Sequence, residues 1–375
     1  MKKIVVSGYY GYGNTGDEAV LYAILRTLRK TAESEDLDLI VLSGDPEQTA
    51  EAYKVTAVSR WNPVQVLKAI RKADLFISGG GSLIQDVSSS WSPRYYLWLL
   101  SMARILAKKV MVYAQGIGPL NNPKLRKKTG RLMEKCDIIT VRDVESREDL
   151  LRMGVSKEIH VIADPVMALR KNIVPTEPGI AFLRDLGLTD QWGRKKRPVL
   201  GVFLRSFRND RFCRTLALAL DQRVRDGWDI LMIPMQHRVD MEVAVEIGNM
   251  MEETLFYLGK PLTPREILSL TGQLDMVLGM RLHSLILSAV MGVPMIALAY
   301  DPKVERFISQ LGMILCLHMD DLELEKINES FRWTEIHWRE QVESGEGRIQ
   351  FMYRQAWETA AMAVNLLDIQ EEAHG

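Results

Sequence analysis

The chain has 375 residues, which is enough for two domains of ordinary size, and its 47% hydrophobic and 26% charged residues are typical of a globular protein. Lys plus Arg and Asp plus Glu both number 48, so the formal net charge of zero excludes a general attraction to nucleic acid or to an anionic membrane. Any anion-binding site must therefore be local.

The short lengths of the apolar stretches and the spacing of the cysteines indicate a cytoplasmic protein. No uninterrupted apolar stretch reaches the roughly 18 residues of a spanning helix. The start, residues 1–8, is too short for the apolar core of a signal peptide and predicts a first strand. Cys136, Cys213 and Cys316 fit no zinc or redox spacing, and we expect buried thiols in a reducing compartment. The apolar stretch 95–106 predicts a core helix, with a membrane-surface helix as the alternative.

Short apolar runs alternate with helical patterns through the first half of the chain. Such alternation predicts βαβ units and a parallel sheet. The predicted strands are residues 4–7, 37–42, 73–78, 110–113, 138–141 and 159–162. Ligands of such sheets bind beyond the carboxyl ends of the strands, so we expect the loops that follow these strands to form one binding edge.

A second α/β series follows a stretch rich in proline, glycine and basic residues. Its predicted strands are residues 199–204, 230–235, 276–278 and 295–299. The sequence therefore predicts an N-terminal Rossmann-like domain over 1–172, a linker over 173–197, a C-terminal Rossmann-like domain over 198–335 and a helical tail over 336–375. Apolar residues in the tail recur at helical spacing, which predicts a closing helix that packs back on the first domain.

The first loop contains a G-x-G-x-x-G pattern at Gly11, Gly13 and Gly16, which raises the alternative of a nicotinamide cofactor. Asp17 and Glu18 stand where a pyrophosphate would meet the helix, and like charge there repels it. Asp17 has two interpretations that the sequence leaves open. It stabilises the first turn of the helix, or it receives a proton from a sugar hydroxyl.

Two further glycine-rich turns follow predicted strands. The run from Gly79 through Gly80 and Gly81 would expose backbone amides that hold an anion or lie under a sugar, and a simple tight turn is the alternative. The stretch from Gln115 to Pro119 permits the same close approach, and the Gln115 amide is suited to bind a hydroxyl.

The most informative motif joins a strand to a helix through Arg281, His283 and Ser284. The guanidinium forks onto phosphate or carboxylate, and the helix N-terminus adds partial positive charge. His283 is a candidate proton donor, with a structural histidine as the alternative. Two more cations, Arg205 and Lys303, follow predicted strands of the same domain and are candidates for a second anionic group.

These residues together resemble the polysaccharide pyruvyltransferases, and in particular the bacterial cell-surface-anchoring type. That type modifies secondary cell-wall polymers, and the pyruvylated polymers anchor surface-layer proteins. The resemblance runs along almost the whole chain. It is carried by residues 8–19, the glycine triplet 79–81, residues 115–119, 142–143, 164–165, 204–205, 281–284, 292–294 and 300–303.

The resemblance implies two Rossmann-like domains that face a cleft, as in type B glycosyltransferases. It implies phosphoenolpyruvate as donor and a 4,6-linked pyruvate ketal on N-acetylmannosamine in a lipid-linked repeat unit. On this basis His283, Arg281 and Asp17 are the catalytic candidates, with Asp143 and Asp164 as alternatives to Asp17 for the base. The donor ligands are assigned to Arg205, Arg281, Lys303 and Ser284. The acceptor ligands are assigned to Asn14, Thr15, Gly80, Gly81, Gln115 and Arg142.

The sequence shows no cluster of metal ligands and the reaction requires no covalent enzyme intermediate, so we expect no metal and no cofactor besides the co-substrate. The protein would act in the cytoplasm, with contact to the inner face of the membrane and a homo-oligomer left open. The alternatives are a nucleotide-sugar glycosyltransferase of the same fold, a non-catalytic sugar-binding scaffold and an NAD oxidoreductase. Binding of a nucleotide, tolerance to loss of His283, and titration with NADH would distinguish them.

Overall fold

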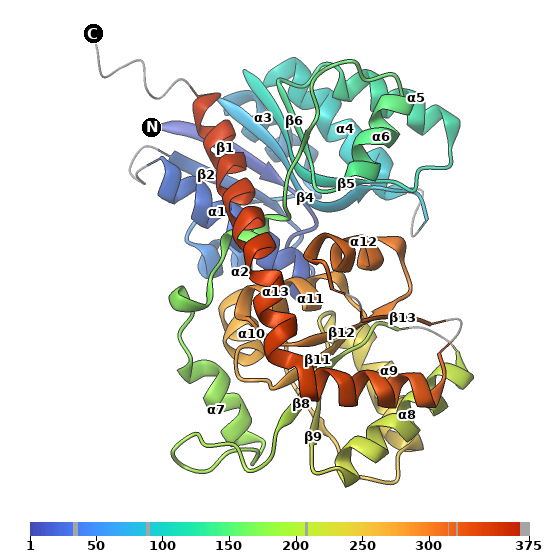
Figure 1. Ribbon diagram of the computed structural model, residues 1–375. Coiled ribbons are helices and arrows are strands. Elements are labelled where there is room, and N and C mark those ends of the chain that lie inside the picture. Colours follow the sequence, from blue (N-terminus) through green and yellow to red (C-terminus); the bar gives the residue numbers. More distant parts are fainter. Residues whose placement is uncertain (33–36, 88–90, 207–208, 314, 320–321, 368–375) are drawn as a thin grey trace. The chain divides into compact units, whose positions relative to one another are not determined.

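The computed structural model describes residues 1–32, 37–87, 91–206, 209–313, 315–319 and 322–367 (Figure 1). The chain divides into two compact units. The N-terminal unit comprises Met1–Tyr12, Asp17–Ala168 and the chain from Met352 onward, and the C-terminal unit comprises Gly13–Gly16 and Leu169–Phe351. The short segment Gly13–Gly16 thus belongs to the C-terminal unit although both its neighbours in sequence belong to the other.

The N-terminal unit is built on a seven-stranded parallel sheet with the order β3-β2-β1-β4-β5-β6-β7. The predicted parallel sheet is confirmed, and β3 is an additional strand. The strands are β1 (Lys2–Ser7), β2 (Leu37–Ser43), β3 (Thr56–Ser59), β4 (Leu75–Ile84), β5 (Lys109–Ile117), β6 (Ile138–Val141) and β7 (His160–Val161).

Helices alternate with these strands. They are α1 (Thr15–Thr31), α2 (Pro46–Tyr53), α3 (Pro63–Lys72), α4 (Trp91–Leu106), α5 (Pro123–Met133) and α6 (Val144–Arg152). One core cluster joins apolar residues of α3, α4, α5 and α6 to Val5, Phe76 and Val112 of the sheet. Tyr96 and Leu100 of α4 are buried in this cluster, as expected for a core helix.

The C-terminal unit is built on a six-stranded parallel sheet with the order β10-β9-β8-β11-β12-β13. Its strands are β8 (Val199–Phe203), β9 (Asp229–Met232), β10 (Phe256–Tyr257), β11 (Met276–Gly279), β12 (Met295–Ala299) and β13 (Cys316–His318). The four predicted strands are confirmed, and β10 and β13 extend the sheet at its two edges.

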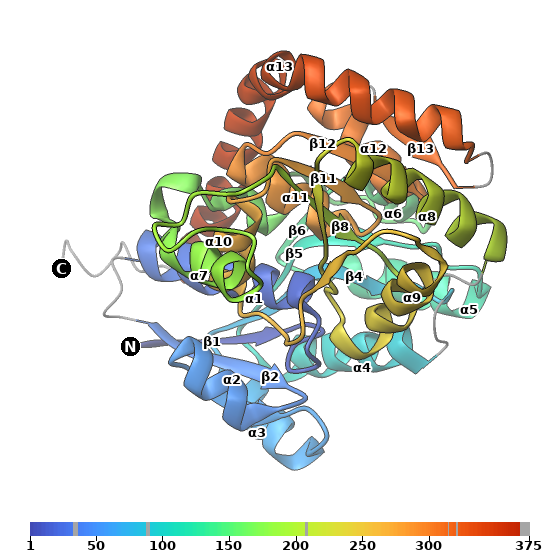
Figure 2. The same ribbon diagram turned by 90° about the horizontal axis from the view of Figure 1, so that it is seen from below.

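The helices of the C-terminal unit are α7 (Glu177–Asp185), α8 (Asp210–Arg225), α9 (His237–Met250), α10 (Pro264–Thr271), α11 (Leu282–Met291) and α12 (Pro302–Leu311). Two 3-10 turns, Pro165–Ala168 and Lys171–Ile173, precede them. α8 and α9 lie side by side (Figures 1 and 2) and share a core cluster with β8 and β9. α7 falls inside the stretch 173–197 that the sequence predicts as a linker.

The last helix, α13 (Leu324–Asn365), begins before the predicted tail 336–375, and residues 368–375 of that tail lie outside the described residues. The helix has a kink at His337, where φ is −108° and ψ is 19°. From Met352 onward it belongs to the N-terminal unit, in which the Gln355 side chain donates to the Val161 carbonyl at 3.3 Å. The predicted packing of the closing helix on the first domain is confirmed.

The three cysteines are free thiols. Cys136 and Cys213 are buried as predicted, but Cys316 is partly exposed because it lies on the edge strand β13, so that expectation was wrong. Burial raises the pKa of Cys136 to about 12 and that of Cys316 to about 11. A protonated thiol is a poor nucleophile and metal ligand, so these cysteines are not candidates for catalysis.

Candidate active site

The predicted donor residues follow neighbouring strands of the C-terminal sheet. Arg205 comes just after β8 and Arg281 just after β11, and these strands pair in parallel with Phe203 opposite Gly279. β12 pairs with β11 on its other side and leads to Lys303 in the first turn of α12. Adjacent strands lie about 4.8 Å apart, so the three cations stand along one short stretch of the sheet's carboxyl edge.

Arg281 is held by a buried carboxylate that the sequence did not reveal. Its Nη2 forms an ion pair with Asp240 of α9, a residue that is only 1% exposed. The other oxygen of Asp240 accepts hydrogen bonds from the backbone amides of Met235 and Gln236, at 3.1 and 2.8 Å. A carboxylate with three donors is fixed in place, so the Arg281 side chain is oriented before any ligand arrives.

The segment Met235–Gln236, whose amides donate to Asp240, also pairs with the first glycine-rich loop. The Thr15 amide donates to the Met235 carbonyl at 2.8 Å, and Asn14 forms an antiparallel bridge with Gln236. Asn14 and Thr15, which the sequence assigns to the acceptor, therefore lie in the same unit as the donor candidates. Their role as acceptor ligands stays a prediction.

Gly16 of this loop lies against His283. A Cβ added to Gly16 would stand 2.6 Å from Nδ1 of His283, closer than a side chain can approach. His283 is in the first turn of α11, as the sequence predicts. The structure thus brings Arg281, His283 and the Asn14–Gly16 segment together within the C-terminal unit.

Ser284 has a local structural partner. It is completely buried, and its hydroxyl donates to the carbonyl of Arg281 at 2.5 Å. That bond ties the first turn of α11 to the arginine that precedes it. Ser284 thus supports the Arg281 backbone, and direct contact with the donor stays a prediction.

Arg205 and Lys303 share one aromatic ring. The Arg205 guanidinium lies 4.9 Å from the ring centroid of Tyr300, and the Lys303 ammonium lies 5.8 Å from it. Lys303 also pairs with Asp301 at 3.1 Å. Tyr300 therefore positions both cations at the same place, which sequence spacing alone did not reveal.

In the N-terminal unit the glycine triplet is part of a strand and not a loop after one. Gly79 and Gly81 pair with Tyr113 and Gln115 of β5, so the expectation of a free turn was wrong. The glycines allow α1 to pack closely. A Cβ on Gly80 would stand 2.1 Å from Val20, and one on Gly81 would stand 3.2 Å from the Asp17 carboxylate. Asp17 thus lies over the sheet at Gly81.

Gln115 and Arg142 are both buried behind this edge. The Gln115 amide nitrogen donates to Ser78 at 2.8 Å, and its Oε1 is buried without a hydrogen-bond partner. Arg142 donates to Ser82 at 2.7 Å and lies 3.5 Å from the Asp164 carboxylate. The contacts found for both side chains are to neighbouring residues of the same unit. Acceptor binding by either residue stays a prediction.

Tyr10 is a residue of this edge that the sequence interpretation missed. It is 1% exposed, its hydroxyl has no hydrogen-bond partner among the described residues, and a Cβ on Gly79 would stand 3.1 Å from that oxygen. Burial, followed by the negative charge of Asp17, raises the pKa of Tyr10 well above its ordinary value of 10.0. A neutral phenol is therefore held near the Asp17 carboxylate.

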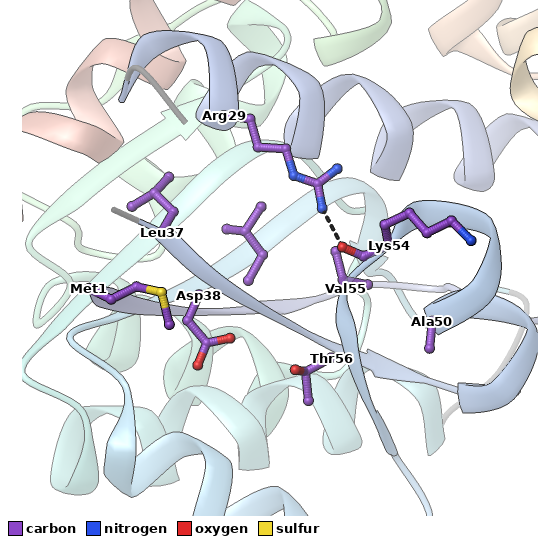
Figure 3. Close-up of a pocket in the computed structure, with 9 residues that line it drawn as sticks. Met1, Arg29, Leu37, Asp38, Ala50, Lys54, Val55 and Thr56 are labelled. Carbon is purple, nitrogen blue, oxygen red and sulfur yellow. Dashed lines mark hydrogen bonds between the residues drawn. The ribbon is translucent and has the colours of Figure 1, made fainter. Parts of the chain in front are cut away.

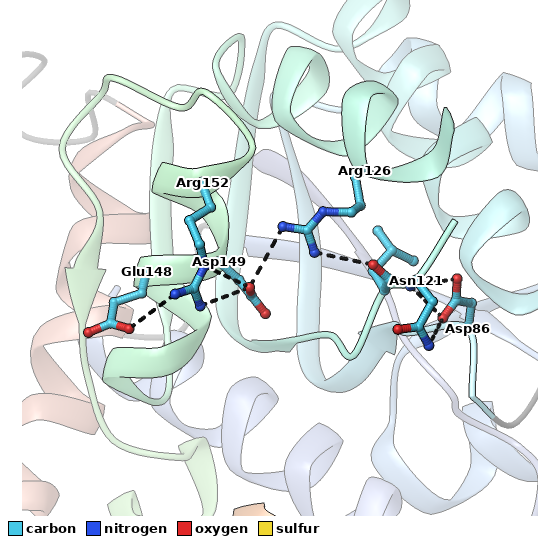
Figure 4. Close-up of polar contacts among 7 residues, drawn as sticks. Asp86, Asn121, Arg126, Glu148, Asp149 and Arg152 are labelled. Carbon is cyan, nitrogen blue, oxygen red and sulfur yellow. Dashed lines mark hydrogen bonds and ion pairs between the residues drawn. The ribbon is translucent and has the colours of Figure 1, made fainter. Parts of the chain in front are cut away.

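A polar network fixes the loop after β5 (Figure 4). The Asp86 carboxylate accepts from the backbone amides of Asn121 and Asn122 at 2.8–2.9 Å, and Arg126 donates to the Leu120 carbonyl at 3.2 Å. Arg126 also approaches Asp149 of α6 at 3.9 Å. Residues 115–117 of the predicted turn 115–119 are the end of strand β5, so that expectation was wrong for these three residues. The segment that follows them has a backbone restrained at several points.

A pocket of about 380 Å³ lies away from these residues, at the amino ends of β1 and β2 (Figure 3). Met1, Leu37 and Asp38 line it, and Arg29 donates to the Lys54 carbonyl at 2.8 Å on its wall. Parallel sheets bind their ligands at the opposite, carboxyl edge. None of the predicted site residues lines this pocket.

Comparison with known proteins decides the family. The family model described as polysaccharide pyruvyl transferase matches residues 14–302, which span both units and contain every predicted catalytic residue. The chain belongs to this family. It is therefore a polysaccharide pyruvyltransferase that acts on a polysaccharide acceptor.

Individual proteins are similar to this chain at greater distance. The amylovoran biosynthesis protein AmsJ of Erwinia amylovora is 21% identical, over 83% of this chain and 86% of AmsJ. Two solved structures share the fold. A putative UDP-N-acetylglucosamine 2-epimerase from Listeria monocytogenes has a TM-score of 0.62 at 13% identity, covering 100% of this chain and 98% of the epimerase. Anabaena HepE in complex with UDP-glucose has a TM-score of 0.61 at 12% identity, covering 100% and 99%.

The expected fold class, two Rossmann-like units of the type B glycosyltransferase kind, is confirmed by these neighbours and the two parallel sheets. None of the described helices combines the length and apolar character needed to cross a bilayer. The described residues also contain no group of three or more His, Cys, Asp or Glu side chains that could hold a metal ion.

Gly16→Ala is expected to lower the kcat of the pyruvyltransferase by up to about 10²-fold, because the new methyl group must displace the His283 ring from its position. Gly259→Ala is the matched control, since an added Cβ there meets nothing within 4 Å. Steady-state kinetics of both variants would check this. Equal activity of the two variants would mean that the position of His283 over Gly16 is not needed for turnover.

Proposed function

We propose that this pyruvyltransferase moves pyruvate from phosphoenolpyruvate onto N-acetylmannosamine as a 4,6-linked ketal. The acceptor is a lipid-linked precursor of a secondary cell-wall polysaccharide, and the modified polymer supports the anchoring of surface-layer proteins. The observation that carries the donor half of this proposal is the Arg281–Asp240 pair beside His283, with Arg205 and Lys303 in the segments that follow the adjacent strands β8 and β12. The acceptor half rests on the resemblance of the sequence to the cell-wall branch of the family.

Phosphoenolpyruvate carries a phosphate and a carboxylate on one small enol. Its site needs two cationic groups and one acid. In this proposal Arg281 binds one anionic group of the donor with the N–H groups that Asp240 leaves available, and Arg205 and Lys303 bind the other. Tyr300 keeps the second pair of cations together.

The proposed reaction requires one proton donor and two sugar hydroxyls. His283 protonates the methylene carbon of the enol or assists the departure of phosphate, and C2 gains oxocarbenium character. One hydroxyl oxygen bonds to C2 and loses its proton, with Asp17 as the proposed base. The second hydroxyl then attacks C2 and gives its proton to the departing phosphate, the bond from C2 to the phosphate oxygen breaks, and phosphate leaves with the electron pair.

The proposed acceptor and reaction imply where the enzyme works and what it requires. A lipid-linked precursor would place the enzyme at the inner face of the cell membrane, and a homo-oligomer is compatible with this role. No cofactor and no metal enter the proposed steps. Activity that disappears on chelation and returns with a divalent ion would contradict that part.

The test is the release of phosphate from phosphoenolpyruvate, measured with and without a synthetic lipid-linked disaccharide that contains N-acetylmannosamine. The proposal expects release that depends on this acceptor. Binding of phosphoenolpyruvate without turnover would keep the donor and overturn the acceptor. No binding of phosphoenolpyruvate, together with binding of a nucleotide sugar, would replace the proposal with a nucleotide-sugar glycosyltransferase.

A further inference from the structure

An arginine surrounded by aromatic rings lies at the carboxyl edge of the N-terminal sheet. Arg60 follows the last residue of β3, and its backbone amide donates to the carbonyl of Ser43 at the end of β2. Its guanidinium carbon lies 4.3–5.6 Å from the ring centroids of four aromatic side chains. These are Tyr12, Trp61, Tyr95 and Tyr96. We refer to these four residues and Arg60 as the Arg60 cluster.

The hydrogen bonds of the Arg60 guanidinium use only part of its donor capacity. Nη1 donates to the Gly8 carbonyl and to the Tyr96 hydroxyl, both at 3.3 Å. Nε is buried and has no hydrogen-bond partner among the described residues. A guanidinium has five N–H donors in a planar fork, so this one retains unused donors.

Among the residues that the structure describes, Arg60 also lacks a carboxylate partner. Its side chain forms no ion pair with a carboxylate in the described part of the chain, although the residue is only 8% exposed. A buried cation is normally paired, because removing charge from water is costly. The aromatic faces supply part of the missing stabilisation through cation–π contact. An anionic ligand would supply the remainder.

The rim of the cluster presents aromatic surface to solvent. Trp61 is 69% exposed, and Tyr9 is 36% exposed and stacks on Tyr12 with centroids 4.4 Å apart. Large exposed aromatic side chains that gather at one place are typical of ligand sites. The C–H faces of a pyranose ring pack well on such rings, because an aromatic face carries partial negative charge and is apolar.

We propose that the Arg60 cluster binds a sugar that carries a phosphate, with the sugar ring on Trp61 and the Tyr9–Tyr12 pair and the phosphate on the Arg60 guanidinium. The two halves of the ligand match the two features of the site, which are exposed aromatic faces and a buried cation with no carboxylate partner in the described part of the chain. This inference deepens the proposed function and rests on it, since it gives the chemical class of the part of the acceptor that lies next to its carrier.

The experiment is isothermal titration of the full-length protein with three probes. They are N-acetylglucosamine 1-phosphate, the methyl glycoside of N-acetylglucosamine, and inorganic phosphate. The sugar phosphate is expected to bind at least about tenfold more tightly than either of the others, because only it uses both the charge-assisted hydrogen bonds and the aromatic faces. Equal affinity for inorganic phosphate would overturn the sugar half, and equal affinity for the methyl glycoside would overturn the phosphate half.

Two variants assign the binding to this place. Arg60→Met is expected to abolish the preference for the phosphorylated sugar, and Trp61→Ala to weaken binding of the sugar phosphate without changing binding of inorganic phosphate. Because Trp61 is exposed, its replacement tests the site even where loss of Arg60 impairs folding. Trp192→Ala is the matched control, since Trp192 is 70% exposed and lies 5.0 Å from the Arg194 guanidinium in the C-terminal unit.

An effect of Trp61→Ala no larger than that of Trp192→Ala would overturn the proposal. The titrations need no turnover and no phosphoenolpyruvate. A failure here therefore leaves the test of pyruvyl transfer intact, and a failure of pyruvyl transfer leaves these titrations interpretable.

Discussion

His283→Ala is expected to lower kcat about 10²- to 10⁴-fold while changing the KM for phosphoenolpyruvate much less, because a general acid acts in the transition state and contributes little to ground-state binding. The residue is in the first turn of α11, next to Arg281 and against Gly16. Steady-state kinetics with phosphoenolpyruvate as the varied substrate would measure both constants.

The control for this prediction is His318→Ala. His318 lies on the edge strand β13, its side chain is 59% exposed, and its nearest charged partner is Glu305 at 3.4 Å. The control should retain the activity of the unmodified enzyme. Small and equal changes in kcat and KM for both variants would remove His283 from the chemistry.

Asp240→Asn is expected to lower the free energy of unfolding by about 3–5 kcal/mol, because it leaves the guanidinium of a buried pair without its charge partner. It should also raise the KM for phosphoenolpyruvate, since Arg281 is no longer held at the edge of the sheet. The amide nitrogen of the new side chain would also face the backbone N–H groups that the carboxylate accepts from. Urea unfolding and steady-state kinetics measure the two effects separately.

Asp221→Asn provides a control of the same kind in the same unit. Asp221 is 2% exposed and accepts from the backbone amides of Glu252 and Glu253 at 2.9–3.1 Å, with no arginine partner in the described part of the chain. Its replacement should destabilise the protein and leave the KM for phosphoenolpyruvate unchanged. An unchanged KM in both variants would mean that Asp240 stabilises the unit but does not position Arg281 for the donor.

Much of the fold could be predicted because buried parallel strands are continuous apolar runs. The stretches 138–141 and 295–299 coincide with β6 and β12. The strands that were missed, β3, β10 and β13, lie at sheet edges, are two to four residues long, and have no fully buried residues. Their pairing is set by the neighbouring strand, which local periodicity does not report.

The glycine triplet 79–81 illustrates a second reason why a sequence-based prediction fails. Three glycines in succession favour a turn in isolation, yet here they lie in the middle of β4. The competing factor is tertiary packing, because Val20 and Asp17 of α1 occupy the space that side chains on Gly80 and Gly81 would fill. A single sequence does not show that contact.

Some residues of the candidate site could also be predicted from the sequence, and others could not. Arg281, His283, Arg205 and Lys303 could be predicted because each follows a recognisable strand. Asp240 and Arg60 could not be predicted, since their importance arises from partners that are distant in sequence. Asp240 precedes Arg281 by 41 residues, and Arg60 donates to the carbonyl of Gly8 across 52 residues. The only local signal at Arg60 is the adjacent Trp61.

Pyruvyl transfer is tested by mass spectrometry of the acceptor glycan after incubation with phosphoenolpyruvate labelled in its three carbons. We expect a glycan that gains one labelled pyruvate ketal for each phosphate released. Release of phosphate while the glycan stays unlabelled, or a glycan that changes only when a nucleotide sugar is supplied, would contradict it.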